Sequence, residues 1–149
     1  MIQRKQTAFL AIAAISLLLL FLFPVYGFEK DGQQIMLFIY GIGALSPDFI
    51  ALIALNVLSI FLLVLIIFLY KKRTLQMKLC KLATLLIAGL IVAIFYFAED
   101  AKSFPELAGY TSEIRPAMVS PLAALVLVIL ANRFIKKDED LVRSADRLR

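Results

Sequence analysis

Four long apolar blocks alternate with polar segments along this chain of 149 residues. They cover residues 7–25, 49–70, 79–97 and 117–135. Each block approaches the roughly 20 residues that a helix needs to cross a hydrocarbon core of about 30 Å. The apolar residues are continuous and do not alternate with polar ones, so helices are expected rather than the strands of a membrane barrel. The pattern predicts an all-α membrane protein, a bundle of four transmembrane helices in one domain over residues 1–149.

Composition agrees with a membrane protein. Hydrophobic residues make up 62% of the chain and charged residues 18%, whereas soluble domains have roughly 45–50% and about 25%. The first block follows Arg4 and Lys5 and could be read as a signal peptide. Its apolar run is longer than the roughly 7–15 residues of such a peptide, and no small-x-small cleavage site follows it. We therefore expect an uncleaved helix.

The distribution of charge predicts the orientation. Residues 1–6, 71–81 and 133–149 together hold 13 of the 16 basic residues and 4 of the 11 acidic ones, a net charge of +9. The two remaining loops hold 3 basic and 7 acidic residues, a net charge of −4. Lys and Arg favour cytoplasmic loops. We therefore expect a membrane protein with several crossings and with both termini in the cytoplasm. The high pI of about 9.5 then reflects sidedness, and nucleic acid is not an expected partner.

The polar segments carry weaker signals. A Lys-Asp-Gly-Gln turn at residues 30–33 between apolar stretches indicates a small extracytoplasmic β-hairpin. The fourth helix could begin near Pro116 or at Ser120–Pro121. The tail, residues 136–149, is predicted to be an amphipathic cytoplasmic helix capped by Asp138. Its apolar face comprises Leu141, Val142, Ala145 and Leu148. This face could lie on the anionic inner leaflet or dock on a protein.

Little in the sequence indicates chemistry. The chain has no His and a single Cys, Cys80, so neither a His-based catalyst nor a disulfide-exchange pair is available within the chain. No carboxylate lies inside an apolar block, which weakens the case for an ion-driven transporter. Asn56 and Ser59 share one face of the second block, where they could line a polar cavity or form interhelical hydrogen bonds. Gly89 and Ala93 form a small-xxx-small patch suited to close packing within the bundle or between copies. We expect no cofactor and no metal.

Three stretches resemble a known family. The start MIQRKQT, the turn LYKKRTLQMKLCKL and the end LANRFIKKDEDLVRSADRLR are similar to domain of unknown function family 4293, a family of small bacterial inner-membrane proteins. The resemblance implies four helices and an inner-membrane location, and it implies no activity. The residues that carry this pattern are Gln3, Arg4, Gln6, Tyr70, Leu75, Gln76, Cys80, Asn132, Arg133, Arg143, Asp146 and Arg147.

The predicted topology brings polar residues from several helices to the cytoplasmic side. We expect a polar cluster or docking face there, with the acids at 138–140 available to pair with Arg4, Lys5 or the cations at 71–73. The candidate residues are Gln3, Arg4, Gln76, Asn132, Arg133, Arg143, Asp146 and Arg147.

Three functions remain open from the sequence. The favoured one is a non-enzymatic accessory, assembly or scaffold protein whose partners are the lipid bilayer and a membrane or cytoplasmic protein, with self-association left open. The second is a small transporter or lipid-handling protein, which would need a polar cavity reaching Asn56. The third is an enzyme acting at the outer surface through Glu99, Asp100 or Glu113.

Overall fold

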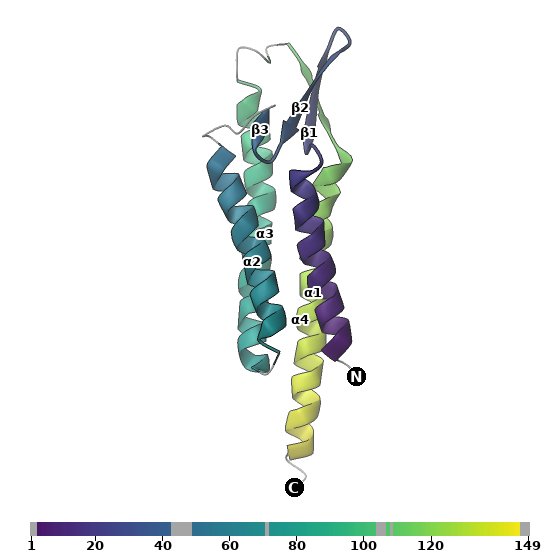
Figure 1. Cartoon of the computed structure of the whole chain (residues 1–149), viewed down its shortest axis with the longest axis vertical. Coiled ribbons are helices and arrows are strands. Elements are labelled where there is room, and N and C mark those ends of the chain that lie inside the picture. Colours follow the sequence, from purple (N-terminus) through teal and green to yellow (C-terminus); the bar gives the residue numbers. More distant parts are fainter. Residues whose placement is uncertain (1–2, 43–48, 71, 104–106, 108, 147–149) are drawn as a thin grey trace.

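A computed structural model describes residues 3–42, 49–70, 72–103, 107 and 109–146. Within them, four α-helices run along the long axis of the molecule, and both chain ends lie at the same end of the bundle (Figure 1). The helices are α1 (Gln3–Leu18), α2 (Ile50–Phe68), α3 (Arg73–Ala101) and α4 (Val119–Asp146). Short 3₁₀ turns, η1 (Leu19–Phe21) and η4 (Pro116–Met118), end α1 and precede α4.

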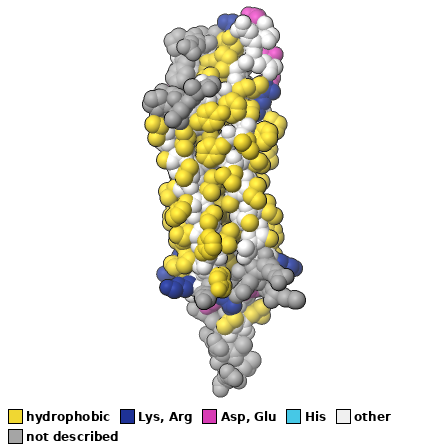
Figure 2. Space-filling model, viewed as in Figure 1, with side chains coloured by type: hydrophobic (Ala, Val, Ile, Leu, Met, Phe, Trp, Pro, Cys, Tyr) yellow, Lys and Arg dark blue, Asp and Glu magenta, His cyan; other side chains and the backbone are white. Residues whose placement is uncertain are grey.

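The outer surface of the bundle is apolar. Hydrophobic side chains cover its middle, and Lys and Arg gather at the lower end in the view of Figure 2. Three helical segments, Ile50–Phe68, Arg73–Ala101 and Pro116–Val142, are long and apolar enough to cross a membrane, and only about a third of each is buried inside the protein. A multi-pass membrane protein is expected to show this outward apolar surface. The corresponding segment of the first helix, Lys5–Phe21, is shorter.

The helices pack as a ring, in which α1 contacts α2 and α4, and α3 contacts the same two helices. Fully buried alanines, including Ala13, Ala83, Ala124 and Ala131, lie in the interior. Small side chains let helix backbones approach closely, which is the main source of packing energy where lipid is the solvent. Gly89 is not part of this interior, because a Cβ added there would meet nothing within 4 Å. Packing inside the bundle is therefore wrong for Gly89, whereas Ala93 packs against the core; packing of the patch between copies stays a prediction.

The prediction of an all-α fold is wrong in one respect, because a small antiparallel sheet covers one end of the bundle. Its strands are β1 (Tyr26–Lys30), β2 (Gln33–Phe38), β3 (Gly41–Ile42) and β4 (Thr111–Ile114), in the order β3-β2-β1-β4. The predicted hairpin is confirmed: β1 pairs with β2, and Asp31 and Gly32 between them both have positive φ. Such a two-residue turn matches the twist of the strands it joins. Strand β4, which lies between α3 and α4 in the chain, then pairs with β1.

The first helical segment ends earlier than the apolar block that predicts it. Helical structure stops at Phe21, and Val25 donates its backbone N–H to the carbonyl of Leu37, 2.9 Å away. Pro24 lies between them, and a proline cannot donate to a continuing helix. The last apolar residues of the block therefore lead into the sheet.

The tail is not a separate helix. Helix α4 continues without a break to Asp146, and Asp138 is buried inside it and does not cap a new helix. No Gly or Pro interrupts residues 122–146, so nothing in the sequence stops the helix that begins at Val119. The 3₁₀ turn η4 at Pro116–Met118 precedes it, so helical structure begins near Pro116, the earlier of the two predicted starts.

Candidate functional site

Residues that are far apart in the sequence meet at one end of the bundle, which we call the basic end. It holds the start of α1, the turn between α2 and α3, and the C-terminal part of α4 (Figure 1). The exposed cations here include Lys5, Lys72, Lys136 and Lys137. The opposite end carries the sheet, and we call it the sheet end.

A buried polar contact ties the first helix to the last at the basic end. The side-chain amide of Gln6 donates a hydrogen bond to the Oδ2 atom of Asp138, and the two side chains are 7% and 8% exposed. Asp138 continues the buried face of α4 that includes Ala131 and Ile135, at helical spacing. The sequence analysis predicted that the acids at 138–140 pair with cations. In the structure, Asp138 instead accepts a hydrogen bond from the uncharged amide of Gln6.

Gln76 performs a similar task on the other side of the bundle. It is 5% exposed, and its amide donates to the backbone carbonyl of Ile66, 2.8 Å away. This carbonyl lies in the last turn of α2, where it also accepts the backbone N–H of Leu69 at 3.2 Å. Gln76 therefore holds α3 against the end of α2 and does not face solvent.

The other predicted site residues on α4 point in different directions. Asn132 is half-buried, and its Oδ1 atom has no hydrogen-bond partner among the described residues. Arg133 is exposed and lines a groove of about 350 Å³. The remaining lining residues of this groove are Lys136, Lys137, Asp140 and Leu141.

The structure describes only the backbone positions of four predicted residues, Gln3 and Arg4 on α1 and Arg143 and Asp146 on α4, all at the basic end. Arg147 lies outside the described residues. Of the predicted residues whose side chains are described, Gln76 is buried in the bundle and Arg133 is exposed on its surface.

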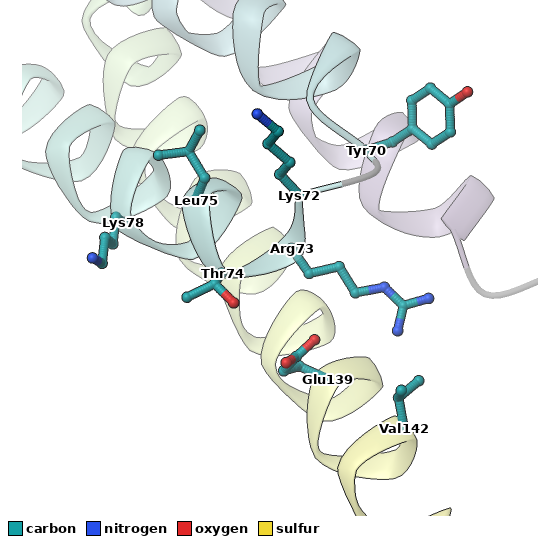
Figure 3. Close-up of a pocket in the computed structure, with 8 residues that line it drawn as sticks. All are labelled: Tyr70, Lys72, Arg73, Thr74, Leu75, Lys78, Glu139 and Val142. Atoms are coloured by element: carbon teal, nitrogen blue, oxygen red, sulfur yellow. The ribbon is translucent and has the colours of Figure 1, made fainter. Parts of the chain in front are cut away.

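A larger groove of about 810 Å³ opens between the α2–α3 turn and α4 at the basic end (Figure 3). We call it the basic groove. Arg73 extends from the start of α3 toward α4, while Lys72 and Lys78 point in other directions (Figure 3). Three cations and one carboxylate line it, a net charge of +2. The full lining is Tyr70, Lys72, Arg73, Thr74, Leu75, Lys78, Glu139 and Val142.

Halfway along the bundle, the predicted polar pair is fully buried. Asn56 donates from Nδ2 to the backbone carbonyl of Leu17 at 3.3 Å, which ties α2 to α1. Ser59 donates to the carbonyl of Leu55, 2.8 Å away in its own helix. Neither residue lines the basic groove or the smaller groove beside it.

The acids at the sheet end are surface residues. Glu99 accepts a bond of 2.6 Å from Lys102, and Glu113 lies 3.9 Å from Arg115. Burial, and then the negative charge of Glu99, raise the pKa of the neighbouring Tyr26 phenol. Across the part of the chain that the structure describes, no three His, Cys, Asp or Glu side chains are grouped so that they could hold a metal ion.

Comparison with known proteins identifies the family. The family model described as "Domain of unknown function (DUF4293)" matches residues 2–148. The chain belongs to the DUF4293 family. The resemblance seen in the sequence is therefore confirmed over nearly the whole chain. No curated protein matches it.

The residues that carry the DUF4293 resemblance gather mostly at the basic end. Gln6 and Gln76 make the two buried bonds described above, and Tyr70 and Leu75 line the basic groove. Cys80, one helical turn after Gln76 in α3, is fully buried. The sequence analysis did not include Gln6 among the candidate site residues. Its position could have indicated a buried role, because Gln6 lies at helical spacing from the buried residues Leu10, Ala13 and Leu17 of α1.

Proposed function

We propose that this protein is a non-enzymatic accessory or scaffold protein of the bacterial inner membrane. In this proposal its four helices all cross the bilayer, both termini lie in the cytoplasm, and the basic end docks an acidic segment of a partner protein. The observation that carries the proposal is the extension of α4 beyond the other three helices beside the basic groove (Figure 1).

The length of the first helix is compatible with a crossing. Its apolar segment, Lys5–Phe21, has 17 residues and spans about 26 Å at 1.5 Å per residue, close to a hydrocarbon core of about 30 Å. The segment also packs along α4, which is itself long enough to cross. Lys5, Lys72 and Arg133 lie at the basic end, and the preference of Lys and Arg for the cytoplasmic side supports placing that end inside the cell.

The extension of α4 supports docking. Leu141 and Val142, near the end of α4, are 52% and 43% exposed. Val142 lines the basic groove together with Glu139, opposite the cations of the α2–α3 turn. Exposed apolar side chains next to a field of one sign are typical of a surface that binds a complementary partner. The net charge of the groove favours an acidic partner segment.

Transport has less support. Asn56 and Ser59 each donate to a backbone carbonyl inside the bundle. The Oδ1 atom of Asn56 is buried and has no hydrogen-bond partner among the described residues, but neither residue lines the two grooves at the basic end. Interhelical hydrogen bonding is the usual role of such residues in membrane proteins.

Crosslinking from inside the groove tests the proposal. A photoreactive amino acid replaces the exposed Thr74, and crosslinks are formed in living cells. We expect one protein partner, which is lost in the double variant Lys72→Glu/Arg73→Glu, because like charges then oppose an acidic segment. The double variant Lys5→Glu/Lys81→Glu is the matched control. It makes the same change of charge at the same end, on exposed residues that do not line the groove.

A shortened chain separates the tail from the groove. Ending the chain at Asp140 removes Leu141 and Val142 but keeps Asp138 and its bond to Gln6. We expect this chain to lose the partner while it remains in the membrane at normal level. Equal crosslinking in the groove variant and in the control variant would refute docking at the basic groove.

A further inference from the structure

A second groove lies at the sheet end, where η1 meets the start of α4. Its volume is about 540 Å³, within the range of roughly 300–1,000 Å³ that small-molecule sites occupy. The lining is apolar apart from Arg115 and Ser120. It comprises Leu19, Phe23, Pro24, Met36, Arg115, Pro116, Ala117 and Ser120. We call it the outer groove.

The backbone fixes Arg115 at the junction of the sheet and the helices. Its N–H donates to the carbonyl of Val25 at 3.1 Å, and its own carbonyl accepts from the N–H of Met118 at 3.0 Å. The guanidinium lies directly against Gly27 of β1. A Cβ at Gly27 would come within 2.4 Å of Nε and 2.7 Å of Nη2 of Arg115, closer than atoms can approach. Glycine at position 27 therefore makes room for the arginine.

The charge of Arg115 is only weakly satisfied by the protein. Among the described residues it forms one ion pair, with Glu113, whose carboxylate is 3.9 Å away and more than half exposed, so this ion pair contributes little. The Nε atom is buried and has no hydrogen-bond partner among the described residues. Lys102, by comparison, bonds Glu99 at 2.6 Å. The side chain of Arg115 is 25% exposed and lines an apolar groove, and a guanidinium pairs best with a carboxylate or a phosphate.

The position of the outer groove indicates where such an anion comes from. Leu19 and Phe23 are 37% and 53% exposed at the end of the first membrane segment. On the α4 side, Val119 and Leu122 are also exposed. An apolar lining at the end of the membrane-facing surface, with one cation at its rim, is complementary to an amphiphile that has an apolar chain and an anionic head.

We propose that the outer groove binds one anionic phospholipid of the leaflet next to the sheet. One acyl chain lies along the apolar lining, and the phosphate accepts hydrogen bonds from the guanidinium of Arg115. This site goes beyond the docking function proposed above and is independent of it, because the two sites lie at opposite ends of the bundle.

Fluorescence quenching can test this site alone. The chain has no Trp, so Phe23→Trp places a single reporter in the outer groove. The full-length protein is reconstituted in phosphatidylcholine vesicles that contain a small fraction of lipid with brominated acyl chains, either phosphatidylglycerol or phosphatidylcholine. We expect brominated phosphatidylglycerol to be enriched at this reporter by about tenfold, the lower end of what one charge-assisted hydrogen bond provides. Tyr96→Trp, an exposed reporter on α3, should show no such preference.

Three variants in the Phe23→Trp chain identify the cause. Arg115→Gln removes the charge, and Gly27→Ala keeps the charge but displaces the guanidinium, so both should abolish the preference. Lys102→Gln, which removes a cation at the same end but outside the groove, should retain it. Circular dichroism shows whether each variant is folded. Equal quenching by the two brominated lipids in the parent chain would overturn the proposal, and so would a preference that survives Arg115→Gln. Absence of quenching by both lipids would also overturn it, since the groove would then be covered by protein.

Discussion

Replacing Gln6 by Leu should destabilise the bundle far more than its position at the end of α1 suggests. The substitution removes the donor to Asp138 and leaves that carboxylate more than nine-tenths buried without its partner. Leu has a similar volume, so little packing is lost. The effect therefore isolates the polar contact between α1 and α4.

The expected magnitude follows from the burial of both groups. A hydrogen bond to a charged group contributes about 1.5–3 kcal/mol, and an unpaired buried group carries a desolvation cost of similar size. We expect Gln6→Leu to lower the free energy of unfolding by about 2–3 kcal/mol. Asp138→Leu should cost about 1–3 kcal/mol, because it leaves the amide of Gln6 without an acceptor. The double variant Gln6→Leu/Asp138→Leu should lie within about 1 kcal/mol of the parent, since two apolar side chains replace the pair.

Unfolding in mixed detergent micelles, with a rising fraction of denaturing detergent and circular dichroism as the signal, measures each free energy. Lys5→Leu is the control, because it makes a similar change on the exposed neighbour of Gln6. The four chains with and without Gln6 and Asp138 form a double-mutant cycle. A double variant whose loss equals the sum of the two single losses would refute the reasoning, because the two residues would then act independently.

Three further outcomes are expected from the same assay. Gln76→Leu removes the bond to the carbonyl of Ile66 and should cost about 1–2 kcal/mol; a change below the error of the assay would contradict the role of Gln76 in joining α2 and α3. Asn56→Leu should cost about 0.6–1.7 kcal/mol, whereas Ser59→Ala should have almost no effect because Ser59 bonds only its own helix; equal effects would contradict this assignment. Because burial raises the pKa of Tyr26, the unfolded chain loses this proton first as the pH rises, so stability should be full below pH 10, the ordinary pKa, and decline above it. Tyr26→Phe should reduce that decline, and an unchanged decline would count against the raised pKa.

The helices could be predicted from the sequence because lipid imposes a simple rule. A helix that faces hydrocarbon must be apolar on nearly all sides, so each helix contains most of one apolar block, although its ends differ from those of the block. The hairpin could also be predicted, because Asp31 and Gly32 suit the turn that they form. Strand β4 could not be predicted from the sequence. All four of its residues, Thr111–Ile114, are exposed, so no alternation marks it, and its partner β1 lies about 80 residues earlier in the chain.

The candidate site could be predicted only in part from the sequence. The gathering of polar residues at the basic end follows from topology, and the structure places them there. Which of them bond to one another depends on how each helix is rotated about its axis, and apolar blocks without a polar face leave that rotation undetermined. Gln6 and Asp138 belong to the buried faces of α1 and α4 and so meet each other, whereas Arg133 faces outward. The outer groove depends on the pairing of β1 with β4, which the sequence did not indicate.

If all four helices cross the bilayer, the basic end and the sheet end lie on opposite sides of the membrane. Cysteine labelling can determine the side on which each end lies. Cys80 is the single cysteine and is fully buried, so a Cys80→Ser chain provides a background for one new cysteine at a time. Suitable exposed positions are Lys5, Thr74 and Ser144 at the basic end and Ser112 on β4.

A maleimide that cannot cross membranes is applied to intact spheroplasts and then to lysed ones. We expect Ser112→Cys to be labelled in intact spheroplasts, and Lys5→Cys, Thr74→Cys and Ser144→Cys to be labelled only after lysis. Labelling of Ser112→Cys and Thr74→Cys on the same side would refute this topology, because α3 would then not cross the membrane. Labelling of Lys5→Cys in intact spheroplasts would contradict the crossing of α1 and the cytoplasmic location of the N-terminus.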